Sequence, residues 1–263
     1  MILRAQSIGR VAYDYLVQRN TWTVHSIFNK GFNIITKNNQ LIFIGTTENG
    51  TFPFGIVVDS QTRDELLAQI VVGQEIKVGY STLEFNSAYQ LFWRLETILS
   101  EQPPHNQYLE DLTENITTFY FSEYEDSDFD FATMRRFINA LTTTDKMTVE
   151  QMLRYVIGRG QGLTPTGDDI LTGILFIHSI QPYIETLHLE TLRQLLDESL
   201  TTRVSETFLH CALNGLFSSK VKILQDEPFI VRLNQLLEVG SSSGKDTLYG
   251  IYISLTLRSE TYG

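Results

Sequence analysis

The pattern of apolar and polar positions changes along this chain at a Pro-Pro segment, residues 101–107. Before it, short β-branched or aromatic runs are separated by turn residues. These runs predict strands at residues 23–28, 32–36, 41–46 and 54–59, and a hairpin at residues 75–85 that turns near Gly79. Because the connections are too short for crossover helices, we expect the strands to pair mostly antiparallel.

Helical spacing of apolar residues predicts two helices in this first part, at residues 61–70 and 87–99. Thr62 and Glu65 have capping-box spacing at the start of the first. After the break almost every segment reads as helix, at residues 108–118, 131–141, 149–157, 170–180, 185–200, 204–217, 228–237 and 247–257. The prediction is an α+β protein. A mostly antiparallel β region (1–100), as a sheet or small barrel, precedes a mostly α-helical domain (101–263).

Two segments of the helical part repeat the pattern [Ser/Thr]-Gly-x-Asp-x-Leu-x-Gly. The matched positions are Thr166, Gly167, Asp169, Leu171 and Gly173 in the first copy, and Ser243, Gly244, Asp246, Leu248 and Gly250 in the second. Each copy runs into a stretch that is apolar nearly all round, which is typical of a buried helix. Helix N-termini offer free backbone N–H groups that bind anions. We therefore expect the two loops to converge and form one pocket for a small anion.

The aspartates of the repeat admit two interpretations. Each lies three residues after its hydroxyl residue, so both can simply cap their helices. That interpretation does not explain Asp168, a second carboxylate beside Asp169. We predict that Asp168 contacts a metal, an arginine or the substrate, and that Lys245, at the equivalent place in the second copy, brings the opposite charge to the same site. The predicted catalytic residues are Asp168, Asp169 and Lys245, and a divalent cation such as Mg²⁺ would be bound by Asp168 and Asp169.

Further candidates flank the first loop. Alternating glycines around Arg159 let the backbone approach a ligand, which Arg159 would clamp, although a flexible connection with a solvent-facing arginine is equally consistent. The hydroxyl cluster at residues 201–205 either adds hydrogen bonds or Arg203 to the pocket or caps the next helix. The predicted substrate-binding residues are Arg159, Gly160, Gly162, Thr164, Thr166, Gly167, Thr202, Arg203, Ser242, Ser243, Gly244 and Asp246.

The composition of the chain argues against some classes of binding partner. The formal net charge is −11, which argues against nucleic acid because phosphate backbones require clustered Lys and Arg. Five of the carboxylates lie in residues 123–130, which we interpret as a solvated loop or linker. The longest apolar stretch, residues 170–180, is too short to span a bilayer, so we expect no membrane partner. The single cysteine, Cys211, fits a reducing cytosol, and we expect a cytoplasmic protein.

The string Gly-Leu-Thr-Pro-Thr-Gly-Asp-Asp at residues 162–169 is the hallmark of a bacterial family long described only as a domain of unknown function. Weaker supporting strings lie at residues 201–205 and 242–250. Over residues 155–252 the chain therefore resembles this family. One branch of the family is the AllH-type subunit of oxamate carbamoyltransferase, from anaerobic allantoin breakdown.

The resemblance implies a subunit that acts with two other proteins, one of them similar to acyl-CoA synthetases. Together such subunits convert oxalurate and phosphate into oxamate and carbamoyl phosphate. The resemblance carries no catalytic residues onto this sequence. Two alternatives stay open: a stand-alone metal-assisted hydrolase or ligase that uses the Asp168–Asp169 pair, and a non-catalytic anion-binding or scaffold subunit.

Overall fold

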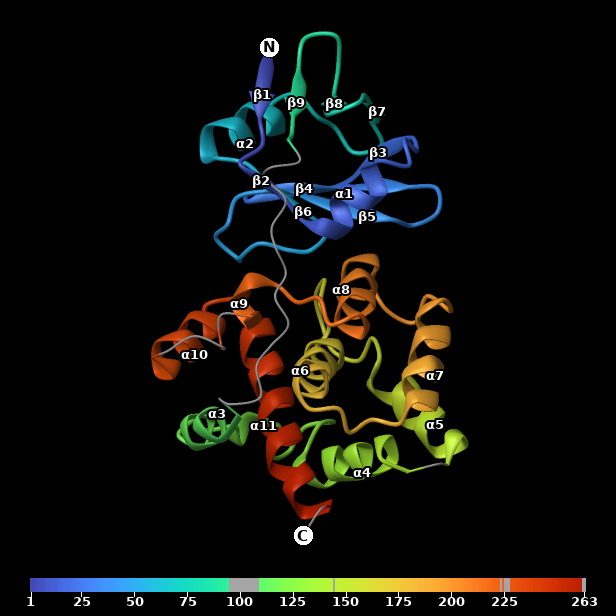
Figure 1. Ribbon diagram of the computed structural model, residues 1–263, viewed down its shortest axis with the longest axis vertical. Coiled ribbons are helices and arrows are strands. Elements are labelled where there is room, and N and C mark those ends of the chain that lie inside the picture. Colours follow the sequence, from blue (N-terminus) through green and yellow to red (C-terminus); the bar gives the residue numbers. More distant parts are fainter. Residues whose placement is uncertain (95–108, 144, 223, 225–227, 262–263) are drawn as a thin grey trace. The chain divides into compact units, whose positions relative to one another are not determined.

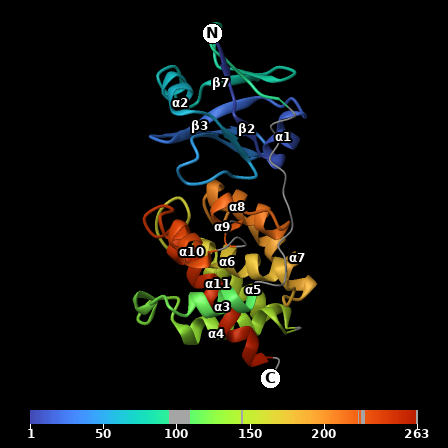
Figure 2. The same ribbon diagram turned by 60° about the vertical axis from the view of Figure 1, so that its left-hand side comes forward.

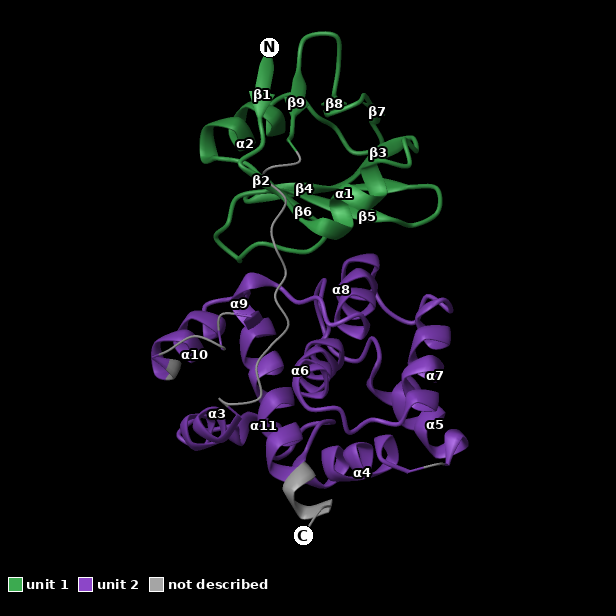
Figure 3. Ribbon diagram, in the orientation of Figure 1, with its two compact units in different colours: residues 1–102 green, residues 103–263 purple. Residues whose placement is uncertain are grey.

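The computed structural model describes residues 1–94, 109–143, 145–222, 224 and 228–261. Its chain forms two compact units, Met1–Gln102 and Pro103–Gly263, which Figure 3 shows in different colours. Each unit has a hydrophobic core of its own. The predicted break at residues 101–107 lies outside the described residues.

The first unit is built on one curled, nine-stranded sheet with the strand order β1-β9-β8-β7-β3-β4-β5-β6-β2 (Figure 1). The strands are β1 (Ile2–Arg4), β2 (Ser7–Ile8), β3 (Trp22–Phe28), β4 (Gly31–Thr36), β5 (Leu41–Gly45), β6 (Gly55–Val57), β7 (Glu75–Val78), β8 (Thr82–Glu84) and β9 (Gln90–Phe92). Among these described strands only β1–β9 and β5–β6 pair in parallel. The predicted, mostly antiparallel β region is confirmed.

The sheet buries an apolar core because alternate side chains of a strand point to the same face. In β3, for example, Trp22 and Val24 are buried while the residues beside them are more exposed. Ile34 of β4 joins the same core, as do Leu16 and Leu66 from two helices. These helices are α1 (Arg10–Leu16) and α2 (Ser60–Leu67).

Two predictions for this unit are wrong. The N-cap of α2 is Asp59, whose carboxylate accepts a hydrogen bond from the Thr62 backbone N–H at 2.7 Å, so Thr62 does not start a capping box. Residues 90–92, predicted as helix, form β9 instead, because they complete ladders with both β1 and β8 and bury Leu91. The end of that predicted helix, residues 95–99, lies outside the described residues.

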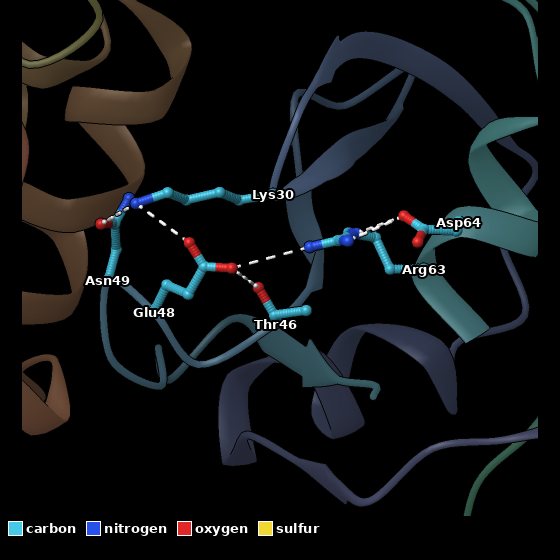
Figure 4. Close-up of polar contacts among 6 residues, drawn as sticks. All are labelled: Lys30, Thr46, Glu48, Asn49, Arg63 and Asp64. Atoms are coloured by element: carbon cyan, nitrogen blue, oxygen red, sulfur yellow. Dashed lines mark hydrogen bonds and ion pairs between the residues drawn. The ribbon is translucent and has the colours of Figure 1, made fainter. Parts of the chain in front are cut away.

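A polar cluster holds the loop that follows β5 (Figure 4). Glu48 lies between two cations, with Lys30 Nζ at 3.4 Å and Arg63 Nη1 at 3.6 Å. Lys30 also donates to the Asn49 side-chain oxygen at 3.1 Å, and Arg63 pairs with Asp64 at 2.8 Å. The cluster thereby ties the β3–β4 turn and α2 to the loop between the parallel strands β5 and β6.

The second unit is helical, as predicted. Its helices are α3 (Leu109–Ile116), α4 (Phe131–Leu141), α5 (Lys146–Val156), α6 (Thr166–Ile180), α7 (Thr186–Leu196), α8 (Arg203–Leu213), α9 (Ser219–Lys222), α10 (Phe229–Leu237) and α11 (Ser243–Thr261), with a 3₁₀ turn at Ser122–Tyr124. Helix α6 lies in the centre, and α5, α8 and α11 pack against it. Figures 1 and 2 both show α11 running past α6.

The central position of α6 explains its sequence. Ile170, Leu171, Ile174, Phe176 and Ile177 have no measurable exposure, although they point in different directions around the helix. A helix surrounded by other helices can bury apolar side chains on every face. The predicted buried helix is confirmed. The loop before α6 and the N-terminus of α6 lie near the start of α11.

Candidate functional site

The two copies of the repeat cross at their last glycines. A Cβ atom on Gly173 would lie 2.2 Å from the Thr247 carbonyl oxygen, and one on Gly250 would lie 2.1 Å from the Ile170 carbonyl oxygen. Each of these carbonyls belongs to the residue three positions before the other copy's glycine. The contact is therefore reciprocal, and glycine at both positions lets α6 and α11 approach with their backbones touching.

The first glycines of the two copies play a matching role against the preceding helices. A Cβ on Gly167 would lie 2.0 Å from the Val156 carbonyl oxygen at the end of α5, and one on Gly244 would lie 1.9 Å from the Leu236 carbonyl oxygen near the end of α10. Gly167 and Gly244, predicted to bind substrate, thus allow close helix packing. Helix pairs α5–α6 and α10–α11 are built alike around their loops.

The loops themselves converge, as expected. The Thr164 hydroxyl of the first loop donates to the Ser243 hydroxyl of the second at 3.3 Å. Hydrogen bonds from Ser243 and Thr164 also act on the Asp169 carboxylate, and bonds from Thr166 and Ser242 act on Asp246. Each aspartate of the repeat is therefore bonded by the hydroxyl residue of the other copy.

This exchange corrects the capping-box interpretation. The N-cap of α6 is Pro165, with no side-chain hydrogen bond, and Thr166 is already the first helical residue. The Thr166 hydroxyl therefore does not cap α6, and its interaction with Asp246 of the other copy lowers the pKa of that carboxyl. The [Ser/Thr]-x-x-Asp spacing here joins two helix starts to each other.

Asp169 and Asp246 are buried carboxylates, and each has one oxygen without a hydrogen-bond partner. They are 7% and 3% exposed, and the oxygen without a partner is Oδ2 in each. Burial raises the pKa of Asp169 well above its ordinary value, and the nearby Asp246 carboxylate acts in the same direction. Burial also raises the pKa of Asp246, against hydrogen bonds led by that from Tyr124. Both groups therefore hold a proton more tightly than an exposed aspartate does.

Asp168 points elsewhere, and its oxygens are already occupied. Oδ1 accepts from the Gly158 backbone N–H at 2.9 Å, and Oδ2 accepts from the hydroxyls of Ser205, at 2.7 Å, and Thr201. Burial raises the pKa of Asp168, although these three bonds oppose the shift. Asp168 and Lys245 do not bring opposite charges to one site as expected, because Asp168 is bonded by residues 158, 201 and 205, whereas Lys245 pairs with Glu123.

A cavity of about 430 Å³ opens where the two loops meet. From the first loop it is lined by Arg159, Gly160 and Thr166, and from the second by Ser241, Ser242, Lys245 and Asp246. Residues 123, 124 and 127–129 complete its lining. Six of the predicted site residues thus share one pocket, namely Arg159, Gly160, Thr166, Ser242, Lys245 and Asp246, while Thr164, Asp169 and Ser243 form a polar layer that joins the loops.

Arg159 is fixed at the edge of this cavity. Its Nε donates to the Tyr155 carbonyl at 2.8 Å, and its guanidinium lies 3.9 Å from the centre of the Tyr155 ring. Nη1 pairs with Asp128 at 2.9 Å. Gly160, with φ of +123°, places its Cα so close to α6 that a Cβ would lie 2.5 Å from the Thr166 nitrogen. Gly162, in contrast, faces open space.

The acidic stretch, residues 123–130, was missed as part of the site. Its Tyr124 ring stacks on Tyr249 with centroids 3.9 Å apart, and its hydroxyl donates to Asp246 Oδ1 at 2.5 Å. Glu123 and Asp128 pair with the two cations of the cavity. Nothing in the composition of the stretch distinguishes it from a solvated loop, except the tyrosine and phenylalanine among its carboxylates.

The hydroxyl cluster at residues 201–205 supports the first loop from outside the cavity. Thr202 caps α8 by accepting from the Ser205 N–H at 3.1 Å, and its hydroxyl donates to the Leu163 carbonyl. Arg203 forms an ion pair with Glu206 at 2.7 Å and does not line the cavity. Thr202 and Arg203, predicted to bind substrate, therefore lie outside the lining of the cavity.

Known family models match both parts of the chain. Residues 4–98 match the model described as the AllH family N-terminal domain, and residues 156–255 match the model described as oxamate carbamoyltransferase subunit AllH. The chain belongs to the AllH family. The second match spans both loops of the cavity, and the first spans the nine-stranded sheet apart from its outermost residues. No solved structure matches the chain.

Membership of the AllH family bears on partners. The family's description names a subunit, so the family acts within a complex that contains further subunits. Among the helices that the structure describes, none combines the length and apolar character needed to cross a membrane. Across the described ranges, no three histidine, cysteine, aspartate or glutamate side chains are grouped so that they could hold a metal ion.

Proposed function

We propose that this chain is the AllH-type subunit of an oxamate carbamoyltransferase-like complex and that it binds a small anionic substrate in the cavity between its two loops. The complex would convert oxalurate and phosphate into oxamate and carbamoyl phosphate, and it would include an acyl-CoA-synthetase-like subunit. Family membership supports the subunit role. The reaction is what the resemblance to the family implies, and anion binding is inferred from the residues that line the cavity.

One observation carries the proposal: the starts of two helices and two basic side chains meet at the cavity. The loops that line it lead into α6 and α11, whose first N–H groups carry partial positive charge. Arg159 and Lys245 add two formal charges at its edge. Oxalurate, phosphate, oxamate and carbamoyl phosphate are all small anions, and about 430 Å³ accommodates any of them.

The same residues suit the chemistry of a carbamoyl transfer. Such a transfer needs its anionic ends held in place and its carbonyl oxygen stabilised as negative charge develops. Arg159 and Lys245 would supply the positive charge. Asp246, which lines the cavity, would accept a hydrogen bond from the amide end of the substrate with its carboxylate. The Asp168–Asp169 pair is not carried forward as a metal site, because the oxygens of Asp168 are taken by three donors.

The test is turnover by the complete complex with single charge-removing variants. We expect Arg159→Met and Lys245→Met each to lower carbamoyl phosphate formation by at least about tenfold, since each removes a charge–charge hydrogen bond to the anion. Arg154→Met is the matched control, because the Arg154 side chain is 39% exposed against 38% for Arg159 and pairs with Glu150 and Glu198, which do not line the cavity.

Two results would contradict the proposal. Turnover of Arg159→Met and Lys245→Met equal to that of Arg154→Met would remove the cavity from the reaction. Weaker phosphate binding by these variants, with turnover unchanged, would instead favour a non-catalytic anion-binding subunit.

A further inference from the structure

Both basic side chains that line the cavity are held by carboxylates of the same short segment, the acidic stretch. Arg159 Nη1 lies 2.9 Å from Asp128 Oδ2, and Lys245 Nζ pairs with Glu123 Oε1. Among the lining residues, Arg159 and Lys245 are the cations that an incoming anion would meet. Carboxylates of the chain itself occupy the positions on these cations that an anionic group would take.

The backbone of the acidic stretch is fixed, so releasing the cations requires only side-chain rotation. Tyr124 stacks on Tyr249 and donates to Asp246, and the Tyr155 hydroxyl donates to the Asp128 carbonyl at 3.0 Å. The Asp128 and Glu123 side chains are 59% and 42% exposed. Water can therefore solvate either carboxylate once it turns away, and ion pairs this exposed are weak.

Arg159 stays in place when its partner leaves. Its Nε bond to the Tyr155 carbonyl and its stacking on the Tyr155 ring do not involve Asp128. A ligand thus meets a guanidinium that is already oriented. It replaces the Asp128 carboxylate, which water can solvate once it is displaced.

We propose that Glu123 and Asp128 are internal competitors: they occupy Lys245 and Arg159 until a phosphate or carboxylate group of the ligand displaces them, and they thereby set the affinity of the cavity. This inference rests on the proposed function, because it requires an anion to bind between the two loops. In this scheme Glu123 and Asp128 act on the affinity for the anion and take no part in bond making.

The experiment measures binding of inorganic phosphate to the full-length chain by calorimetry at constant ionic strength. We expect Asp128→Asn and Glu123→Gln each to bind phosphate roughly two- to fivefold more tightly than wild type, the range that loss of an exposed ion pair allows. Glu125→Gln and Asp126→Asn are the controls, because they remove the same charge from exposed positions of the same stretch that do not line the cavity. Their affinities should stay close to wild type.

A gain in the controls equal to that of Asp128→Asn and Glu123→Gln would overturn the inference, since net charge alone would then explain the effect. The Asp128→Asn/Arg159→Met double variant separates this failure from failure of the proposed function. If it loses phosphate binding while the single carboxylate variants show no specific gain, anion binding in the cavity is supported and competition by Glu123 and Asp128 is contradicted. If it binds phosphate as well as Asp128→Asn does, or if no variant binds phosphate, both proposals fail.

Discussion

Asp168 and Asp169 are neighbours in the chain, yet the helix directs them into different surroundings. Consecutive side chains on an α-helix point about 100° apart. Asp168 therefore turns toward the Gly158 N–H and the start of α8, and Asp169 turns toward the loop of the second copy. Their adjacency suggested a two-carboxylate metal site, but a sequence does not reveal which neighbour covers each face of a central helix.

The first prediction concerns the stability that Asp168 provides. Asp168→Ala leaves Thr201, Ser205 and the Gly158 N–H without their acceptor, so we expect the free energy of unfolding to fall by about 3 kcal/mol. Asp168→Asn should cost less, because its amide oxygen still accepts. Urea titration followed by circular dichroism measures both. An unchanged midpoint for Asp168→Ala would show that these bonds do not stabilise the fold.

The second prediction concerns pH and Asp169. Burial is the largest cause that raises the pKa of Asp169 above its ordinary value of 3.8, so between that value and the raised one the folded state holds a proton that the unfolded state releases. This contribution to stability is full at low pH and is lost as the pH rises through the window. We expect Asp169→Asn to remove it.

The measurement is the difference in unfolding free energy between wild type and Asp169→Asn at a series of pH values. The difference should move in favour of the variant as the pH rises from about 4 toward neutrality. Asp130→Asn serves as the opposite case, because hydrogen bonds led by that from Thr133 lower the pKa of Asp130. Equal pH profiles for wild type and Asp169→Asn would contradict the prediction.

At the scale of elements, the site depends on how closely α6 and α11 approach. The third prediction tests this crossing with Gly250→Ala, which adds a methyl group at 2.1 Å from the Ile170 carbonyl oxygen. Backbone atoms cannot yield as a flexible side chain does, so we expect a loss of about 3 kcal/mol in unfolding free energy. Thr172→Ala, beside Gly173 in α6 but at a partly exposed position, should cost less than about 1 kcal/mol. Similar losses for both variants would argue against a tight crossing.

The same contacts mean that Gly167→Val is not a clean probe of activity. Its side chain would meet the Val156 carbonyl and disrupt the packing of α5 on α6, so loss of turnover would reflect loss of the fold. Substitutions at Arg159 and Lys245 leave these helix contacts untouched.

Local pattern predicted those elements whose stability depends on a regular apolar stripe. The strands β3, β4 and β5 and the helix α4 agree closely with their predicted residues. The prediction for residues 90–92 was wrong because pairing with other strands decides their conformation. One of these strands, β1, is distant in the sequence, and the other, β8, is short. In the site, the repeat predicted convergence of the loops, since glycines and hydroxyls recur at matched positions. The place of the acidic stretch in the site could not be predicted from the sequence, because it depends on the stacking of Tyr124 on Tyr249.

At the scale of the whole molecule, the chain consists of two modules that the family models also separate. The two hydrophobic clusters share no residue, and the matched ranges 4–98 and 156–255 fall in different units. Every residue that lines the cavity belongs to the helical unit. Anion binding should therefore be a property of that unit, and the β unit is available for another role in the complex.

The last prediction follows from this division. A fragment of residues 103–263 contains its own core, so it should unfold in one cooperative transition and bind phosphate within about threefold of the full-length affinity. Thermal unfolding by circular dichroism and calorimetry measure the two properties. Arg159→Met in the fragment should weaken phosphate binding as it does in the full chain, which ties the signal to the cavity. A fragment that folds cooperatively yet binds no phosphate, when the full chain does, would show that the β unit completes the anion site.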